Sequence, residues 1–237
     1  MKLLVLAAGY ATRLYPLTLD RPKHLLEVAG RPILDHVLDA LEPLDFDGVF
    51  VVTNTKFAER FRDWAGSRNV IVVDDGTDNE ETRLGAIGDL DLVIRSHTLG
   101  DDLVVIAGDN LFSEPLEGFP PRRDAPVLGV YDVGDLEAIQ KYNAIEVDDE
   151  GRITFFEEKP EQPRSTVTGI ALYFYPASTL PLVRQYLAEG NNPDQPGRLV
   201  QWLYRRIPFY TWRVPGRWYD IGSRETLAEA DEAFSAS

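Results

Sequence analysis

The sequence has 237 residues, of which 44% are hydrophobic and 27% charged, as in an ordinary globular protein large enough to bury a core of its own. Its formal net charge of −15 at pH 7 would repel nucleic acids and anionic membrane surfaces, so we expect neither as a partner. The chain has no cysteine, which excludes disulfides and thiolate chemistry.

Sequence patterns exclude three further classes of protein. No apolar run approaches the ~20 residues that a membrane-spanning helix needs. None of the three histidines has a partner at metal-ligand spacing, so we do not expect a zinc site. The apolar run near Met1 is too short for a secretory signal and is followed at once by Thr12 and Arg13, so we expect a cytoplasmic protein.

The chain opens with a predicted strand and a loop suited to phosphate. Residues 3–6 are apolar and rich in branched side chains, which predicts a strand buried on both faces. Residues 7–9 are small enough for backbone N–H groups to approach an anion. Thr12 adds a hydroxyl, Arg13 a fork of donors, and Lys23 a second positive charge. A small-residue turn alone is common in α/β proteins, but these additional groups favour a phosphate loop.

Helical and strand patterns then alternate, which is typical of a parallel sheet with helices on both faces. We expect three helices, over residues 33–41, around Phe57 to Trp64, and after Gly85. Pro32 is expected in the first turn of the first of them. The strands between these helices are expected at 48–53, 70–73 and 103–107.

Two glycines, Gly85 and Gly88, stand three residues apart where the third helix is expected to begin. Glycine weakens a helix there, so something must approach the backbone closely. Either a ligand or close packing of the helix on the sheet would explain them.

Asp109 follows the apolar strand at residues 103–107, at the edge of the sheet where ligands of open α/β folds bind. A carboxylate in this position is either a turn former or a metal ligand. Because an acidic chain must attract phosphates locally, a bound divalent metal is favoured.

From residue 126 the pattern changes to strands that we expect to be partly antiparallel, at 127–131, 144–147, 153–157 and 169–175. Helices are expected over 178–187 and 198–206, with an exposed loop between them. The chain then reaches Asp220 and a last helix capped by Ser223. No internal repeat is present.

Five short motifs, in this order, resemble the sugar-1-phosphate nucleotidylyltransferase family, of which glucose-1-phosphate thymidylyltransferases are members. They are the loop from Leu6 to Lys23, Leu84–Leu90, Gly108–Asn110, Glu157–Pro160 and Trp218–Gly222, and Tyr142–Asn143 and Thr168–Gly169 stand where the family has sugar-side segments. The family signature is L-x-G-G-x-G-T-R-L-x-P-L-T-x-x-x-P-K. The chain departs from it at Ala8 and Ala11, which replace glycines.

The resemblance implies a role for each matched position. Nucleotide contacts are expected from Leu6, Ala7, Ala8, Gly9, Thr12, Arg13, Glu81, Gly85 and Gly88. Sugar contacts are expected from Asn110, Asn143, Glu158, Lys159 and Thr168. Asp109 and Asp220 would bind Mg²⁺, and Arg13, Lys23 and Lys159 would be catalytic, with Lys159 meeting the sugar phosphate.

The implied fold is α/β, a Rossmann-like three-layer nucleotidyltransferase fold with a mainly parallel central sheet and an added smaller sugar-binding sheet. We expect one catalytic domain over 1–237, with residues 1–125 binding nucleotide and 126–237 mainly sugar, without the β-helix that extends some relatives. The implied reaction joins a nucleoside triphosphate to a sugar-1-phosphate and releases pyrophosphate. A homo-oligomer remains open, as do the base and the sugar.

Two alternatives remain beside this reaction: cytidylyl transfer to a non-sugar phosphate such as phosphocholine, and a catalytically silent nucleotide-binding regulatory subunit. A dinucleotide oxidoreductase is excluded, because no Gly-x-Gly-x-x-Gly follows the first strand. Under the favoured reaction, Arg13→Ala and Lys23→Ala should each lower turnover by about two orders of magnitude with the fold intact.

Overall fold

The computed structural model describes residues 1–236 and divides into two compact units that interleave along the chain. Unit 1 comprises Met1–Leu84, Ile106–Glu117 and the residues from Pro215 onward, and unit 2 comprises Gly85–Val105 and Gly118–Val214. Within the described residues, no helix is long and apolar enough to cross a membrane.

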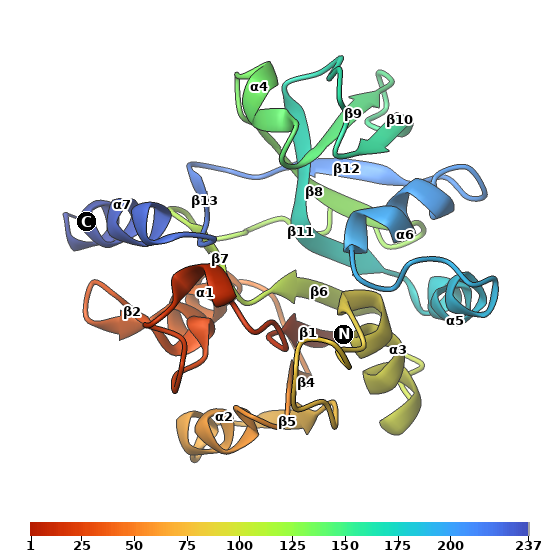
Figure 1. Cartoon of the computed structure of the whole chain (residues 1–237). Coiled ribbons are helices and arrows are strands. Elements are labelled where there is room, and N and C mark those ends of the chain that lie inside the picture. The colour runs from red at the N-terminus through yellow and green to blue at the C-terminus, as the bar shows by residue number, and fades with distance from the viewer. Residues whose placement is uncertain (237) are drawn as a thin grey trace. The chain divides into compact units, whose positions relative to one another are not determined.

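Unit 1 is built on three parallel strands, β1 (Lys2–Leu6), β4 (Gly48–Thr53) and β5 (Val70–Asp74), with β4 in the middle (Figure 1). Leu4 lies opposite Phe50 and Phe50 opposite Ile71. Three successive residues of β1 are 1% exposed or less, which confirms that this strand is buried on both faces. Helices α1 (Ile33–Ala40) and α2 (Ala58–Ala65) connect the strands.

Short elements of unit 1 surround the carboxyl end of this sheet. They are the 3₁₀ turns Thr12–Leu14 and Lys23–Leu25, β2 (Glu27–Val28), β3 (Arg31–Pro32), β7 (Asn110–Phe112), β13 (Trp218–Asp220) and α7 (Arg224–Ser235). Ser223 caps α7 through a capping box, as predicted. Pro32 is not a first-turn residue: it pairs with Glu27 in the β2–β3 hairpin, stays extended, and precedes α1.

Unit 2 combines parallel and antiparallel pairing. Strand β8 (Val127–Asp132) pairs antiparallel with β11 (Val167–Tyr175) and parallel with β12 (Tyr210–Arg213). Strands β9 (Asn143–Val147) and β10 (Ile153–Glu158) form a separate antiparallel pair. The partly antiparallel sheet expected after residue 126 is therefore confirmed.

The helices of unit 2 are α3 (Ala86–Ser96), α4 (Leu136–Ile139), α5 (Leu180–Ala188) and α6 (Pro196–Leu203), with a 3₁₀ turn at Ala177–Thr179. Helix α5 packs against α3 and α6 (Figure 1). Strand β6 (Leu103–Ala107) begins in unit 2 and ends in unit 1. Nothing in the sequence pattern indicated α4 or the 3₁₀ turn, because both are shorter than two helical turns.

The two positions that depart from the family signature have different backbone conformations. Ala11 has φ 51° and ψ 43°, in the left-handed region, whereas Ala8 has no positive φ. A residue with a Cβ pays about 1–2 kcal/mol for the left-handed conformation, and glycine does not. The signature glycine at position 11 therefore has a steric reason that position 8 lacks.

We expect Ala11→Gly to raise the free energy of unfolding by about 1 kcal/mol, because the relief of strain exceeds the extra entropy that glycine gives the unfolded chain. Ala8→Gly is the matched control and should lower stability by up to about 1 kcal/mol. Urea unfolding of both variants measures the difference. Equal effects of the two substitutions would contradict the steric explanation.

Candidate active site

The loop after β1 presents a row of unpaired backbone donors. Among the described residues, none accepts a hydrogen bond from the backbone N–H groups of residues 8–11. Ala7 N–H, by contrast, donates to Val52 O at 2.9 Å, where the loop is still attached to the sheet. Four consecutive N–H groups without acceptors are donors that a phosphate could use.

Two side chains outside the loop hold it in shape. Thr18, which is fully buried, donates its hydroxyl to Ala11 O at 2.8 Å. Asn54, at the end of β4, donates to Ala8 O at 2.8 Å. Both bonds use carbonyl oxygens of the loop and leave its N–H groups free. Sequence reasoning missed Asn54 as a supporting residue, because nothing local marks an asparagine that contacts a loop 46 residues earlier.

Lys23 and Asp109 form a half-buried ion pair. Lys23 follows Pro22 in a 3₁₀ turn and donates through Nζ to Asp109 Oδ2, with 12% and 18% of the two side chains exposed. Asn110 donates to the other carboxylate oxygen, Oδ1, at 2.9 Å. Burial works to raise the pKa of Asp109, but the charge of Lys23 and these hydrogen bonds outweigh it and hold that pKa below its usual value.

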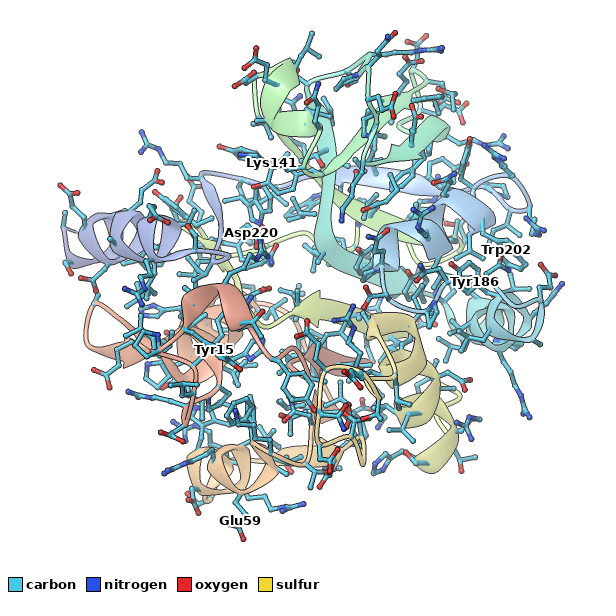
Figure 2. All side chains as sticks on the ribbon, viewed as in Figure 1. Tyr15, Glu59, Lys141, Tyr186, Trp202 and Asp220 are labelled. Atoms are coloured by element: carbon cyan, nitrogen blue, oxygen red, sulfur yellow. The ribbon has the colours of Figure 1, made fainter. Side chains whose placement is uncertain are left out.

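Asp220 reaches the same place through the pairing of β13 with β7. In this antiparallel register Asp220 lies opposite Asn110 and Trp218 opposite Phe112, and Ile221 N–H donates to Asp109 O at 3.0 Å. Trp218 Nε1 donates to Asn110 Oδ1 at 2.7 Å and fixes the amide. The structure therefore brings together two acids that are 111 positions apart in the sequence; Figure 2 labels Asp220 at the end of β13.

The two carboxylates repel each other. Burial, followed by the negative charge of Asp109, raises the pKa of Asp220 to about 6, against the opposing effect of Lys23 and Arg13. An anion held at such a cost is stabilised by a cation placed beside it. The pair fits Mg²⁺, which takes one or two carboxylates and completes its shell with water and phosphate oxygens. Within residues 1–236, no group of three or more His, Asp or Glu is placed to hold a metal by itself.

Arg13 lies beside these acids. A Cβ built on Gly222 would lie 3.7 Å from an Arg13 guanidinium nitrogen and 3.9 Å from Asp220 Oδ2, so the guanidinium is near the Asp220 carboxylate. Arg13 is exposed and forms no ion pair within the described chain. Its donors therefore remain available to an anionic ligand.

His24 packs beneath the Lys23–Asp109 pair as a neutral ring. It is 3% exposed, and burial together with the charge of Lys23 lowers its pKa to about 4. A Cβ on Gly108 would lie 2.9 Å from His24 Cδ2 and 3.0 Å from Val5 Cγ1. The glycine before Asp109 is therefore required for packing, which the sequence alone did not reveal.

In unit 2, Glu158 and Lys159 stand at the end of β10. Lys159 has φ 50°, so a left-handed turn interrupts the alternation that would send the two side chains to opposite faces of a strand. Burial raises the pKa of Glu158, and its Oε2 has no hydrogen-bond partner. A Cβ on Gly197 would clash with that oxygen, so the carboxylate lies against the backbone of α6.

The side chains of Asn143 and Thr168 form hydrogen bonds between β9 and β11. The Asn143 amide donates to Gly169 O at 3.0 Å and accepts from Gly169 N–H at 2.6 Å, and the fully buried Thr168 hydroxyl lies 3.3 Å from Asn143 Oδ1. The amide is thus engaged on both sides, joining β9 to β11. As placed, both side chains support the sheet beside Glu158, and the predicted sugar contacts remain a prediction.

The remaining predicted nucleotide contacts lie at or near the start of α3. Gly85 has φ 78°, and a Cβ there would lie 2.7 Å from Pro193 O. Close approach of the 193–194 backbone is therefore sufficient to require this glycine. Gly88 lies in the first turn of α3, half-buried, and Glu81 lies in an exposed turn of unit 1. Contact of these residues with a nucleotide stays a prediction.

Comparisons with known proteins identify the family of the chain. A family model described as nucleotidyl transferase matches residues 2–237. The UTP–glucose-1-phosphate uridylyltransferase AglF of Haloferax volcanii is 33% identical over 98% of this chain and 96% of that protein. The bifunctional protein GlmU of Methanocaldococcus jannaschii is 25% identical over 98% of this chain, which spans only 54% of that relative's length.

A solved structure of UDP-glucose pyrophosphorylase with UDP-glucose superposes with a TM-score of 0.82 at 20% identity, covering 99% of this chain and 98% of that one. This likeness establishes the α/β nucleotidyltransferase fold with its mainly parallel central sheet. Because the family model covers all but the first residue and AglF aligns over nearly the whole of both proteins, the chain belongs to the nucleotidyl transferase family.

Proposed function

We propose that the protein transfers a nucleotidyl group from a nucleoside triphosphate to a sugar-1-phosphate, with Mg²⁺ held by Asp109 and Asp220. The observation that carries this proposal is the meeting of those two carboxylates with Lys23 and Arg13 in unit 1. Neither alternative is favoured: no observed feature indicates a choline-like acceptor, and all four groups needed for chemistry are retained.

In the proposed reaction a phosphate oxygen of the sugar-1-phosphate attacks the α-phosphorus of the triphosphate. The bond from that phosphorus to the bridging oxygen of the β-phosphate breaks, and pyrophosphate leaves in line. Positioning and charge neutralisation then account for catalysis, without a protein nucleophile. Bound Mg²⁺ would supply charge neutralisation between the reacting phosphates.

The chain's own residues provide the rest of the charge balance. The free N–H groups of residues 8–11 would bind phosphate oxygens of the triphosphate. Arg13 would stabilise the departing pyrophosphate, and Lys23 the charge that develops on the α-phosphate. Lys159, exposed at its left-handed turn, would meet the sugar phosphate, and the Glu158 carboxylate would accept hydrogen bonds from sugar hydroxyls through Oε1, since Oε2 is buried against α6.

Pyrophosphate release tests the reaction and identifies the substrates. Five nucleoside triphosphates are assayed against a panel of sugar-1-phosphates with and without Mg²⁺, beginning with UTP and glucose-1-phosphate because AglF acts on that pair. The proposal expects release that needs both substrates and the metal. Nucleotide binding with no release for any pair would instead favour the silent regulatory subunit.

We expect Arg13→Ala to lower kcat about 100-fold, because removing one donor of this kind costs ~3 kcal/mol of transition-state stabilisation. Arg21→Ala is the control: Arg21 is exposed in the same segment but is paired with Glu27 at 3.0 Å. Its turnover should stay within a few-fold of wild type. Near-normal turnover of Arg13→Ala would refute the role of Arg13.

The ion pair corrects the expectation that Lys23→Ala leaves the fold unaffected. Removing one partner of a buried pair costs about 3 kcal/mol, since Asp109 would be left without its counter-ion next to Asp220. Lys23→Ala should therefore lose stability as well as turnover, and stability must be measured before its kinetics are interpreted. Unchanged urea unfolding of this variant would contradict the pairing.

We expect Asp220→Asn to stabilise the metal-free protein at pH 7.5 by up to about 3 kcal/mol, since the carboxyl's folded pKa lies about two units above its ordinary value. A carboxyl group whose pKa is higher in the folded than in the unfolded state destabilises the fold at a pH above its folded pKa. At a pH below its unfolded pKa the group has no effect on stability. The difference between variant and wild type should therefore shrink as the pH falls through 6 and vanish near 4. Both proteins contain His24, so the effect of its titration on stability cancels when the variant is compared with wild type.

Urea unfolding in EDTA measures this difference, and repeating it in Mg²⁺ tests the metal. Mg²⁺ should stabilise the wild type more than Asp220→Asn, because a ligand stabilises only the state that binds it. A metal-free variant less stable than wild type at pH 7.5 would show that Asp220 is not a repelled carboxylate.

A further inference from the structure

A polar pocket lies within unit 2, where the end of α5, the loop after it and α6 meet. It has a volume of about 250 Å³. The lining residues on which the argument depends are Tyr186, Arg198, Gln201, Trp202, Arg205 and Arg206. None of them is among the predicted nucleotide, sugar or metal contacts, so the pocket is separate from the groups assigned above.

The pocket is cationic in a chain whose net charge is −15. No ion pair within residues 1–236 joins Arg198 or Arg205 to a carboxylate. Arg198 Nε donates to Gln195 at 2.9 Å and Arg205 Nε to Tyr204 at 3.2 Å, which leaves the terminal nitrogens of both guanidinium groups free. Two arginines without acidic partners in one pocket indicate an anionic ligand.

The nearby acid is already engaged. Glu189 accepts from Trp202 Nε1 at 2.8 Å and from Gln185 at 3.0 Å, and lies 3.7 Å from Arg206. Glu189 therefore neutralises Arg206, whose guanidinium also covers the Trp202 ring at 3.8 Å. Within the described residues no ion pair offsets the charge of Arg205, and Arg198 has only the longer-range attraction of Glu158.

The wall of the pocket is rigid. Tyr186 and Trp202 are 2% and 8% exposed and meet edge to face, with ring centroids 5.8 Å apart (Figure 2). Tyr186 also donates its hydroxyl to Asn192 O at 2.7 Å, and Asn191 donates to Tyr186 O at 2.8 Å. These contacts hold the loop against α5 and hold α5 against α6, beside the exposed arginines.

Volume and chemistry together define the ligand. Pockets for drug-sized ligands occupy about 300–1,000 Å³, so a pocket of 250 Å³ favours a smaller molecule. Guanidinium groups match the oxygens of phosphate through paired hydrogen bonds. We propose that this pocket binds a phosphate group, carried either by inorganic phosphate or by a small phosphorylated metabolite.

One side chain of the pocket contacts the backbone of Glu158, the predicted sugar-binding residue. Gln201 lines the pocket, and its Oε1 accepts from the backbone N–H of Glu158 at 3.4 Å. The positive charge of Arg198 acts on Glu158 as well, opposing the rise in pKa caused by burial. A phosphate bound at Arg198 would therefore weaken the electrostatic effect of Arg198 on Glu158. Binding in the pocket could regulate the enzyme in this way.

Two tryptophan indoles report separately on the pocket and on the site in unit 1. Trp202 lines the pocket and its Nε1 is bonded to Glu189, whereas Trp218 Nε1 is bonded to Asn110 beside Asp109. The ¹⁵N-labelled protein is titrated with inorganic phosphate, and separately with a hexose 6-phosphate, against sodium chloride at equal ionic strength. Trp202→Phe and Trp218→Phe assign the two indole signals.

We expect a saturable shift of the Trp202 indole signal with Kd of about 1 mM or below. Arg205→Gln should weaken it at least 10-fold, while Arg184→Gln, an equal charge change at an exposed position of α5 outside the pocket, should not. Whichever phosphate gives the lower Kd identifies the source of the group.

A Trp202 signal that does not saturate by ~20 mM phosphate would overturn the proposal, as would equal weakening by Arg205→Gln and Arg184→Gln. A shift confined to Trp218 would also overturn it, because phosphate would then bind only in unit 1. That last result leaves the proposed nucleotidyl transfer untouched, so the two proposals fail separately.

Discussion

The candidate site depends on two carboxylates that are held together although they repel each other. Asp109 is stabilised by Lys23 and Asn110, whereas Asp220 receives only the weaker influence of Lys23 and Arg13, and its pKa rises to about 6. The pairing of β13 with β7 keeps Asp220 in place regardless of this repulsion. A divalent cation beside the two acids would offset this repulsion, which is the physical basis of the proposed chemistry.

Under the proposed function, the loop after β1 would also bind anions, although the chain is acidic. The loop after β1 leaves its N–H groups at residues 8–11 without acceptors, and the bonds from Thr18 and Asn54 hold its carbonyl oxygens instead. Ala11 carries backbone strain at the point where the loop turns. Attraction for phosphate is thus local, created by oriented donors and a few cations, while the net charge of −15 repels anions at longer range.

Much of this could be read from the sequence, because the signals are local. Strands β4 and β6 were predicted to the residue, since each is an unbroken apolar run, and Ser223 marked the start of α7 through its capping chemistry. The order of motifs predicted the convergence of Asp109 and Asp220. Long-range contacts could not be predicted from the sequence. They include the hydrogen bonds of the Asn143 side chain to Gly169 and the packing of His24 against Gly108. The close approach of the Pro193 backbone to Gly85 is a third such contact.

Anomalous diffraction from a crystal grown with Mn²⁺ and a nucleoside triphosphate tests the central claim most directly. We predict one strong manganese peak with carboxylate oxygens of both Asp109 and Asp220 at about 2.1 Å. A peak bound to neither acid, or the absence of a peak while the nucleotide is clearly present, would contradict the account.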